Sequence, residues 1–368
     1  MPQLKPDIET YARIKVVGIG GAGGKAVTRM VNHRINGVDF VTINTDAQDL
    51  HGTKARTKIH IGKNLTKGLG AGMNPEVGRQ AAEENRDEIH EALKGSDMVF
   101  LTCGLGGGTG SGAGPIVAEA ARDAGALVIG VITKPFSFEG EQRKRIADES
   151  WFQLRDRVDA LITIHNDRLL GIINKETSLL NAFLICDDVL RQAVQGISDL
   201  IITPGVINVD FADVRAIMAD AGTALMGVGY GTGEERAVAA ANAAINSPLL
   251  DVSIDGARGV LFNVSGGPDL TMWEINEAAR VITNSIDPGA KVIFGAVRDE
   301  ELKKGEVKIT VIATGFTEAR ALKPAEAGEP AHPVKRFAPQ EARPAKEAVE
   351  EPESEWDAVP AFLRRKLK

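Results

Sequence analysis

CGLGGGTGSG, residues 103–112, is a glycine-rich stretch that follows a predicted strand at Met98–Cys103 and precedes a helix predicted to open near Pro115. Glycine has no side chain, so backbone N–H groups in such a loop can come close to an anion. The N-terminus of the following helix adds the positive end of its dipole. The order strand, glycine loop, helix therefore predicts a phosphate-binding turn.

Two further loops have the same arrangement. Gly18–Gly23 has the spacing GxGxxG between a predicted strand at 14–17 and a predicted helix at 25–35, and Gly68–Pro75 precedes a predicted helix at 75–94. Carboxyl ends of neighbouring parallel strands meet at one edge of a sheet, where α/β proteins bind ligands. Three such loops indicate several phosphates. The Gly18–Gly23 loop, the first of the three in chain order, is not a Walker A motif, because Lys25 is followed by Ala26 and not by Ser or Thr.

The composition is that of an ordinary globular protein. The 368 residues carry 43 Lys+Arg and 50 Asp+Glu, a formal charge of −7, with 43% hydrophobic and 25% charged residues. This length predicts two domains. The acidity and the 5% of aromatic residues argue against nucleic-acid binding. The two cysteines have no CxxC partner, which argues against a disulfide framework or a zinc site. We expect a cytosolic chain without membrane insertion, since no apolar run approaches ~20 residues.

The order of predicted elements indicates an α/β fold. Strands predicted at 14–17, 38–44, 98–103, 127–133 and 160–164 alternate with helices, which predicts a parallel sheet covered on both faces. A long apolar helix is predicted at 179–202. Strands at 258–264, 291–297 and 307–313, with two intervening helices, predict a smaller α+β domain. The expected organisation is a sheet domain at 1–178, a central helix and loop region at 179–222, and the α+β domain at 223–317.

The remaining residues read as a tail. Seven of the sixteen prolines lie after Ala319, and such a composition predicts a disordered linker at 318–355. About 37 residues of coil have a root-mean-square reach of ~35 Å. The end, 356–368, combines large apolar side chains with a basic terminus, which is typical of a docking peptide. The alternative is a solubilising tail whose end binds nothing.

The loops together resemble a known family. Residues 106–112 resemble the signature loop of the tubulin superfamily, and the chain is identified as a member of its tubulin/FtsZ family by five more motifs: Asn44–Asp46, Gly68–Pro75, Pro135–Gly140, Asn166–Arg168 and Asn208–Asp213. The resemblance covers about Ile14 to Phe316, with a further match in the terminal peptide. It implies a GTPase that forms head-to-tail filaments and the division ring of bacterial cytokinesis, at mid-cell.

The resemblance also implies how GTP or GDP would be bound. In chain order, the second loop, Gly68–Pro75, would face the terminal phosphate, and the third loop, residues 103–112, would line the β-phosphate. Other positions would contact the ribose, read guanine or pack on the base. The residues carried over are Gly20, Gly21, Ala22, Gly23, Gly24 and Lys25; Ala71, Gly72 and Met73; Gly107, Gly108, Thr109 and Gly110; Glu139 and Arg143 (ribose); Asn166 and Asp187 (guanine); and Phe183 (base packing). We expect Mg²⁺ with the nucleotide, and the sequence leaves its ligands open.

Plainer interpretations of some of these residues stay open. Glu139 and Arg143 have the spacing of an ordinary helical ion pair, and Phe183 can simply be part of the core. Lys25 stands where the family commonly has Asn, and a cation at a helix N-terminus costs ~0.3–1 kcal/mol unless a phosphate lies beside it. We hypothesise a nucleotide contact for Lys25, with a solvent-facing side chain as the alternative. His165 replaces a usual Pro, which we interpret as loop variation.

The residues for hydrolysis lie outside the three glycine loops. The resemblance implies that the loop carrying Asn208, Asp210 and Asp213 enters the GTP site of the next subunit. There Asp210 and Asp213 would position the attacking water, with Asn208 in support. A head-to-tail interface that does not close builds filaments. The structural alternative for Asp210 is a cap on a helix that begins at Phe211.

The terminal peptide carries the expected partner contacts. The resemblance implies binding of membrane-tethering adaptors and division regulators through Asp357, Val359, Pro360, Phe362, Leu363 and Arg364. Val359 stands where the family usually has Ile.

The sequence allows two alternative functions. A dinucleotide-dependent oxidoreductase would use Gly18, Gly20, Gly23 and an acidic Asp46, but it leaves the loop at 103–112 without a role. A non-hydrolysing GTP-binding scaffold would keep the fold, but the presence of Asn208–Asp213 argues against it.

Overall fold

The computed structural model describes residues 12–316, except residues 36, 172–176, 204, 249, 251–252 and 300–301. The expected linker at 318–355 and the docking peptide at 356–368 lie outside the described residues. No described helix is long and apolar enough to span a bilayer.

The described strands form a ten-stranded sheet in the order β3-β2-β1-β4-β5-β6-β7-β10-β8-β9. Their bounds are β1 Ile14–Ile19, β2 Val38–Asn44, β3 Thr57–His60, β4 Met98–Gly104, β5 Leu127–Lys134, β6 Ala160–His165, β7 Gly222–Thr232, β8 Gly259–Gly266, β9 Lys291–Arg298 and β10 Glu306–Thr314.

The helices are α1 Gly20–Asn32, α2 Ala47–Gly52, α3 Lys63–Thr66, α4 Pro75–Glu84, α5 Arg86–Leu93, α6 Gly108–Asp123, α7 Glu141–Arg155, α8 Asn166–Leu170, α9 Leu179–Ile202, α10 Phe211–Met218, α11 Arg236–Ile245 and α12 Met272–Thr283. A short 3₁₀ turn, Ser137–Glu139, precedes α7.

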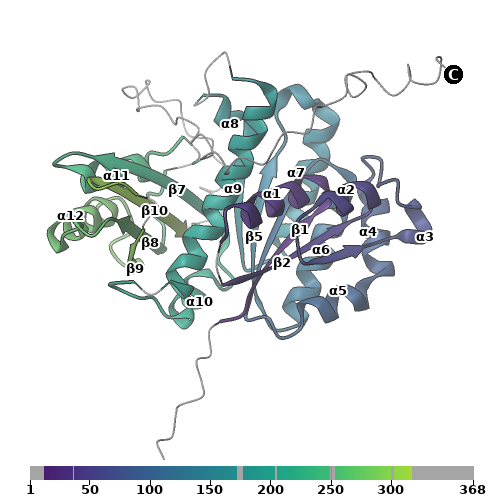
Figure 1. Cartoon of the computed structure of the whole chain (residues 1–368), viewed down its shortest axis with the longest axis horizontal. Coiled ribbons are helices and arrows are strands. Elements are labelled where there is room, and N and C mark those ends of the chain that lie inside the picture. Colours follow the sequence, from purple (N-terminus) through teal and green to yellow (C-terminus); the bar gives the residue numbers. More distant parts are fainter. Residues whose placement is uncertain are drawn as a thin grey trace, which may run out of the picture. The chain divides into compact units, whose positions relative to one another are not determined.

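The sheet has a parallel part and a mixed part. Strands β1 to β6 pair in parallel, and β6 pairs with the start of β7 through Ala160–Ile162. On its other side β7 pairs with β10 in the antiparallel direction. The predicted parallel sheet with helices on both faces is confirmed (Figure 1).

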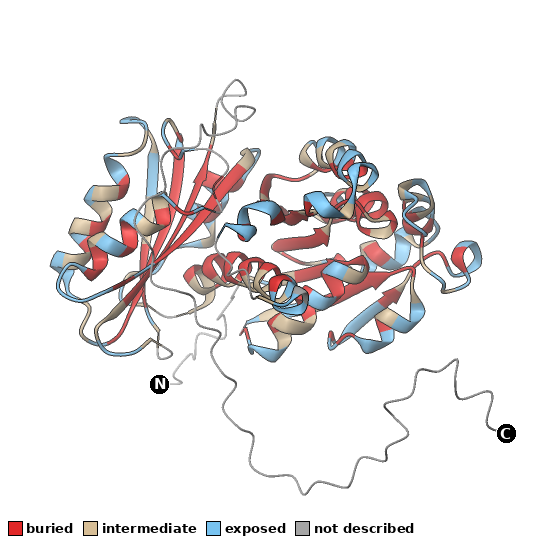
Figure 2. Ribbon diagram, turned by 90° about the horizontal axis from the view of Figure 1, so that it is seen from above, coloured by how far each residue is buried: buried red, intermediate tan, exposed pale blue. Residues whose placement is uncertain are grey.

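Alternation along the strands builds a core on each face of the parallel part. Phe100 of β4 belongs to the cluster under α1 and α9, whereas its neighbour Leu101 belongs to the cluster under α4, α5 and α6. The strands are buried on both faces, as is expected of a parallel sheet (Figure 2). A third cluster lies between the second part of the sheet and α11 and α12.

The central helix α9 joins the two parts. Its residues Leu190 and Val194 are buried in the same cluster as β5 and β6 residues. On the other side, Gly196 approaches β10 so closely that a Cβ there would lie 3.0 Å from the Thr310 methyl carbon. The bounds predicted for this helix, 179–202, are confirmed.

Several predicted boundaries were wrong. Helix α1 begins at Gly20 and α6 at Gly108, five and seven residues earlier than predicted, so two of the three glycine loops are largely the first turns of helices. The single helix predicted at 75–94 is two, broken at Asn85. Strand β7 was not predicted, and α11 precedes β8 instead of lying between later strands. The proposed domain boundaries stay predictions.

Candidate nucleotide-binding site

Two helix N-termini meet at the carboxyl edge of the parallel strands. Helix α1 directly follows β1, and α6 follows β4 after a three-residue turn. Neither helix has an acidic residue in its own first turn to offset the positive end of its dipole, although the Asp49 carboxylate of α2 lies close to Gly21. Helix α4 begins nearby, with the Asn74 side chain accepting a hydrogen bond from the Glu76 N–H at 3.0 Å. Such an edge is suited to an anionic ligand.

The three glycine loops converge, as predicted. A Cβ on Gly20 would lie 3.2 Å from the Gly110 nitrogen, which joins the first loop to the third. A Cβ on Gly108 would lie 2.8 Å from the Ala71 Cβ, which joins the third to the second. The Thr109 hydroxyl also shares a 2.7 Å hydrogen bond with that of Thr45, after β2. The loops therefore form one continuous surface.

Some of these glycines are not required by packing. At Gly107 a Cβ would meet nothing within 4 Å, and its φ of −94° suits any residue. Gly72 also faces open space. A surface of bare backbone with room above it fits phosphate groups, because each missing side chain leaves an N–H accessible. Met73 has φ 61°, which is uncommon for a non-glycine residue and is often found at functional sites.

An aromatic wall stands beside this surface. Phe136 is buried and stacks on Phe138 at a centroid distance of 5.0 Å, and it meets the edge of Phe183 at 5.6 Å. Phe183 is itself 40% exposed. The core interpretation of Phe183 is therefore true only in part, because a large share of its ring is open to a ligand.

Two polar groups are suited to reading a base. Asn166 begins α8 and is only 5% exposed, and its buried Oδ1 has no hydrogen-bond partner among the described residues. A buried acceptor without a partner is costly, and a ligand N–H would satisfy it. Asp187 lies one turn after Phe183 on α9, and its side chain is 20% exposed.

Burial dominates the electrostatics of Asp187. Loss of solvation raises the pKa of this carboxyl to about 6, while the positive charges of Arg29 and Lys25 oppose the rise. The Arg29 Nε lies 3.9 Å from Asp187 Oδ2, across the contact between α1 and α9. A carboxylate can accept from two neighbouring N–H groups of guanine.

The predicted ribose residues are already paired with each other. Arg143 Nη1 donates to Glu139 Oε2 at 2.5 Å, and Glu139 Oε1 accepts from the Phe136 N–H at 2.9 Å. The structural interpretation of this pair is therefore confirmed. Their contact with a nucleotide stays a prediction.

Lys25 lies farther from the helix terminus than the sequence indicated. Because α1 begins at Gly20, Lys25 is in its second turn, where the dipole penalty has largely faded. The side chain is exposed, and its charge acts on Asp187. The argument that a phosphate must offset a dipole cost at Lys25 was therefore wrong, and the contact itself stays untested.

The residues assigned to hydrolysis lie elsewhere. Asn208 Oδ1 accepts from the Gly205 N–H at 2.6 Å and so braces the loop, while Ile207 bridges to Ala296 at the end of β9. Helix α10 begins at Phe211, as predicted, but the Asp210 side chain makes no capping hydrogen bond. The capping interpretation of Asp210 was wrong. Both Asp210 and Asp213 are exposed, and neither carboxylate has a hydrogen bond or ion pair among the described residues.

These two groups of residues are far apart in one chain. Phe183 and Asp187 lie near the start of α9, whereas Asn208 and Asp210 follow its end, as Figure 1 allows the reader to trace. The 15 steps along the helix from Asp187 to Ile202 alone span about 22 Å at 1.5 Å per residue. The exposed carboxylates therefore lie at the opposite end of α9 from the candidate base-reading residues of their own chain.

Sequence reasoning missed some neighbours of the site. Arg29 lies one helical turn after Lys25, and this i,i+4 spacing was a signal that went unused. Phe138 lies within a quoted motif but was not singled out. The partner-binding residues from Asp357 to Arg364 lie outside the described residues.

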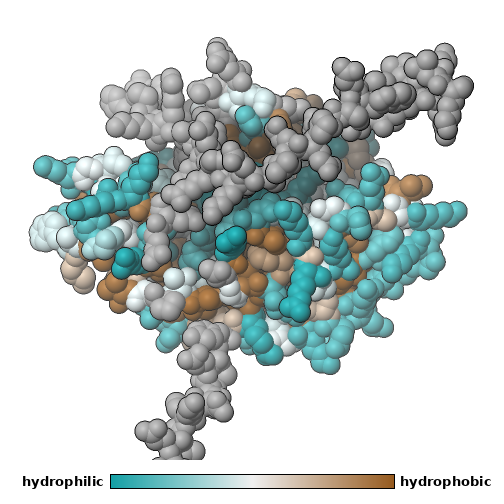
Figure 3. All heavy atoms as spheres, viewed as in Figure 1, coloured by the Kyte–Doolittle hydropathy of each residue, from teal (hydrophilic) through white to brown (hydrophobic). Residues whose placement is uncertain are grey.

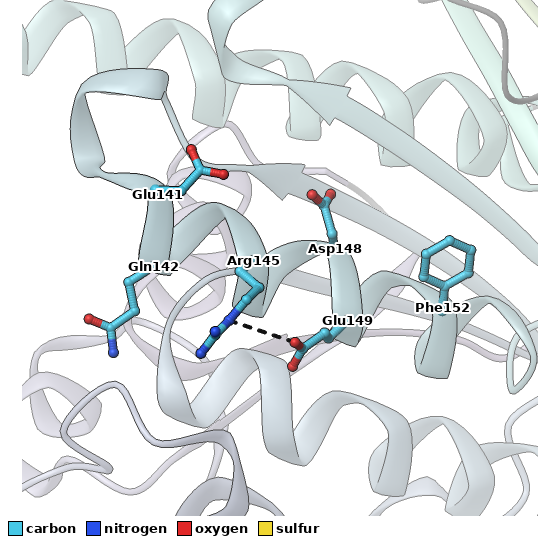
Figure 4. Close-up of a pocket in the computed structure, with 6 residues that line it drawn as sticks. All are labelled: Glu141, Gln142, Arg145, Asp148, Glu149 and Phe152. Atoms are coloured by element: carbon cyan, nitrogen blue, oxygen red, sulfur yellow. Dashed lines mark ion pairs between the residues drawn. The ribbon is translucent and has the colours of Figure 1, made fainter.

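A surface hollow does not belong to the site. It has a volume of about 500 Å³ and is lined by one face of α7, where Arg145 Nε lies 3.8 Å from Glu149 Oε1 (Figure 4). In the described part of the chain, no three His, Cys, Asp or Glu side chains gather closely enough to hold a metal ion.

The fold and the phosphate surface define a GTPase of the tubulin class. A family model described as "Tubulin/FtsZ family, GTPase domain" matches residues 13–174, and one described as "FtsZ family, C-terminal domain" matches residues 222–317. The chain belongs to the FtsZ family, whose activity is GTP hydrolysis, and its nucleotides are GTP and GDP. These matches favour the GTPase over the dinucleotide-dependent oxidoreductase.

Solved structures agree with this assignment. The chain is similar to "FtsZ dimer, empty (M. jannaschii)", at 48% identity over 83% of this chain and 89% of that chain, with a TM-score of 0.80. It is also similar to "CetZ1 from Haloferax volcanii - GDP bound monomer", at 25% identity over 83% of this chain and 95% of that one, with a TM-score of 0.71. A CetZ2 protofilament from the same organism, at 24% identity over 84% and 95%, with a TM-score of 0.69, shares the fold.

Proposed function

We propose that this chain assembles head to tail and hydrolyses GTP between two subunits. The nucleotide would lie on Gly20–Lys25, Ala71–Met73 and Gly107–Gly110, with Asn166 and Asp187 reading guanine. Asn208, Asp210 and Asp213 would come from the neighbouring subunit.

One observation carries this proposal. The exposed carboxylates of Asp210 and Asp213 lie beyond the far end of α9, about 20 Å or more from the candidate phosphate surface of the same chain. Carboxylates that are exposed and unpartnered at a helix start are suited to position a water molecule. A second copy, stacked end to end, brings them to the phosphates.

Exposed apolar side chains support contact at both ends. Leu69, in the second glycine loop, is 84% exposed, and Val206, in the loop that carries Asn208, is 82% exposed. The face drawn in Figure 3 shows brown, hydrophobic residues in its lower centre, interspersed with hydrophilic ones. Apolar side chains placed at both candidate contact surfaces favour association. The related protein named as an FtsZ dimer supports self-assembly of this chain.

In this arrangement each residue has a defined task. Asp210 and Asp213 would orient the attacking water and accept its proton, and Asn208 would hold their loop against Gly205. Mg²⁺ would neutralise charge on the phosphates, and its ligands would be mainly phosphate oxygens and water, because the described residues offer no acidic cluster. Hydrolysis then weakens the interface that made it possible.

The cellular role follows from the family. Filaments of this kind would form the division ring at mid-cell. The terminal peptide, through Asp357, Val359, Pro360, Phe362, Leu363 and Arg364, would bind membrane-tethering adaptors and division regulators. Pull-down of such an adaptor by residues 356–368, and its loss on Phe362→Ala, would test this role.

The hydrolytic assignment is tested by Asp213→Asn. This change removes one charge from an exposed side chain, so GTP affinity and thermal stability should stay as in the wild type. Turnover should fall at least ~100-fold, in line with the loss of a catalytic acid–base group. Asp39→Asn, at an exposed position on β2, is the matched control and should keep full turnover. Normal hydrolysis by Asp213→Asn would refute the role given to this residue.

A further inference from the structure

Two cations on α1 face the base-reading end of α9. Lys25 and Arg29 are four residues apart and so lie on one face of α1, and the charges of both act on Asp187. Arg29 is half-buried, and its Nε is buried without a hydrogen-bond partner among the described residues. A guanidinium held this way, 3.9 Å from a carboxylate oxygen, acts mainly through its charge.

The other charged groups around Asp187 do not replace this effect. On its own helix, Asp188 is negative and opposes ionisation of Asp187, although Arg191 pairs with Asp188 at 2.7 Å. On the loop before α7, Glu139 is paired with Arg143. Burial raises the pKa of the neighbouring Cys186 thiol to about 12, so this thiol carries no charge near neutrality. Among the described residues, the cations of α1 are the charges that favour the carboxylate form of Asp187.

The charge state of Asp187 decides which base it can read. An ionised carboxylate only accepts hydrogen bonds, which suits the N1–H and the 2-amino group of guanine. A protonated carboxyl can donate to adenine N1 and accept from the adenine 6-amino group. Ionisation therefore favours guanine, and protonation removes that preference.

We propose that Arg29 is a positioning residue that keeps Asp187 ionised and thereby makes the base site select guanine over adenine. This inference rests on the proposed role of Asp187 as the guanine reader. It assigns to α1 a second task besides binding phosphates at its N-terminus. Lys25, which is exposed, has the same effect to a smaller degree.

The test is the affinity of the full chain for GTP and for ATP, measured by competition with a fluorescent GTP analogue from pH 5 to pH 8. The phosphates of the two nucleotides titrate alike, so the ratio of their affinities isolates the base. In the wild type the ratio should be constant above pH 7 and should fall about tenfold per unit below about pH 6. The ratio falls toward low pH because guanine binds the ionised form of Asp187, which becomes scarce below its pKa.

Arg29→Gln should move this fall upward by about one pH unit, since a nearby opposite charge typically lowers a carboxyl pKa by one unit or more. Arg29→Lys should restore the wild-type profile. Arg34→Gln removes the same charge just beyond the end of α1 and is the matched control. Lys25→Gln should give a smaller upward shift and covers the case in which Arg29→Gln does not fold.

The outcomes separate the inference from the function beneath it. If Arg29→Gln folds and its profile coincides with that of the wild type, or if its affinity falls equally at every pH, the role of Arg29 is overturned. If Asp187→Asn binds GTP at wild-type affinity across the range, the guanine-reading role itself fails. Loss of GTP by Asp187→Asn together with an unshifted Arg29→Gln profile refutes only the inference.

Discussion

Glycines in this chain serve two different purposes. Gly107 and Gly72 face open space, whereas Gly112 lies against the backbone of α4. The first kind leaves room for a ligand, and the second makes room for a neighbouring helix. The same residue type therefore serves binding at one position and packing at another, a few residues away.

Gly107→Ala tests the binding role. A Cβ has space there, so the cost in folding free energy should stay within about 1 kcal/mol, the usual effect of Ala in place of Gly at an N-cap. GTP affinity should fall at least tenfold, because the methyl group occupies the space above the phosphate-facing N–H. Isothermal titration beside thermal unfolding checks both parts. Unchanged affinity would mean that the phosphates do not approach this residue.

Among the helices, the pair α4 and α6 connects two of the glycine loops. Helix α4 follows the loop at 71–74 and α6 begins at Gly108, and the two helices pack where Gly78 and Gly112 let their backbones touch. Such a contact fixes the second and third loops relative to one another. The geometry of the phosphate surface thus depends on helix packing away from the surface itself.

Gly112→Ala tests this packing. A Cβ at this position would lie 1.9 Å from the Pro75 carbonyl oxygen, so the helices must separate. We expect a loss of about 1–3 kcal/mol in the free energy of unfolding, as for other overpacked sites. Denaturant unfolding measures this loss of stability. Gly125→Ala is not a suitable control, because Gly125 has a φ of +84°. Ala118→Gly, also on α6, removes a methyl group and tests the helix without overpacking. Stability equal to the wild type would show that α4 and α6 can separate freely.

The elements that the sequence predicted, and those it did not, differ in a physical way. Strands β4 and β5 begin with apolar runs, and α9 has a long apolar periodicity, so their patterns are unambiguous. The starts of α1 and α6 are glycine-rich, and glycine has a low helix propensity that only tertiary packing overrides. Strand β7 contains four glycines in eleven residues, a composition that does not predict a strand.

Part of the candidate site could also be predicted from the sequence, and part could not. The convergence of the three loops followed from topology alone, because parallel strands place their carboxyl ends together. The roles of Asn166 and Asp187 came from the resemblance. The effect of Arg29 required the contact between α1 and α9, which no local pattern contains. Whether the Asp210 side chain makes a capping hydrogen bond to α10 likewise depends on the direction of that side chain, which no local pattern contains.

In the whole molecule, the candidate base-reading residues lie near the start of α9 and the exposed carboxylates lie beyond its end. In the proposed arrangement each chain supplies half of each of two sites. Turnover would then be a property of the assembly and not of the subunit.

The most direct test of this claim is GTP turnover per subunit as a function of protein concentration, with Mg²⁺, alongside right-angle light scattering. We expect turnover to be negligible below a threshold concentration, to rise above it together with the scattering, and the scattering to decay as GTP is consumed. Turnover per subunit that stays constant across the threshold, or scattering that ignores GTP, would contradict an active site formed between subunits.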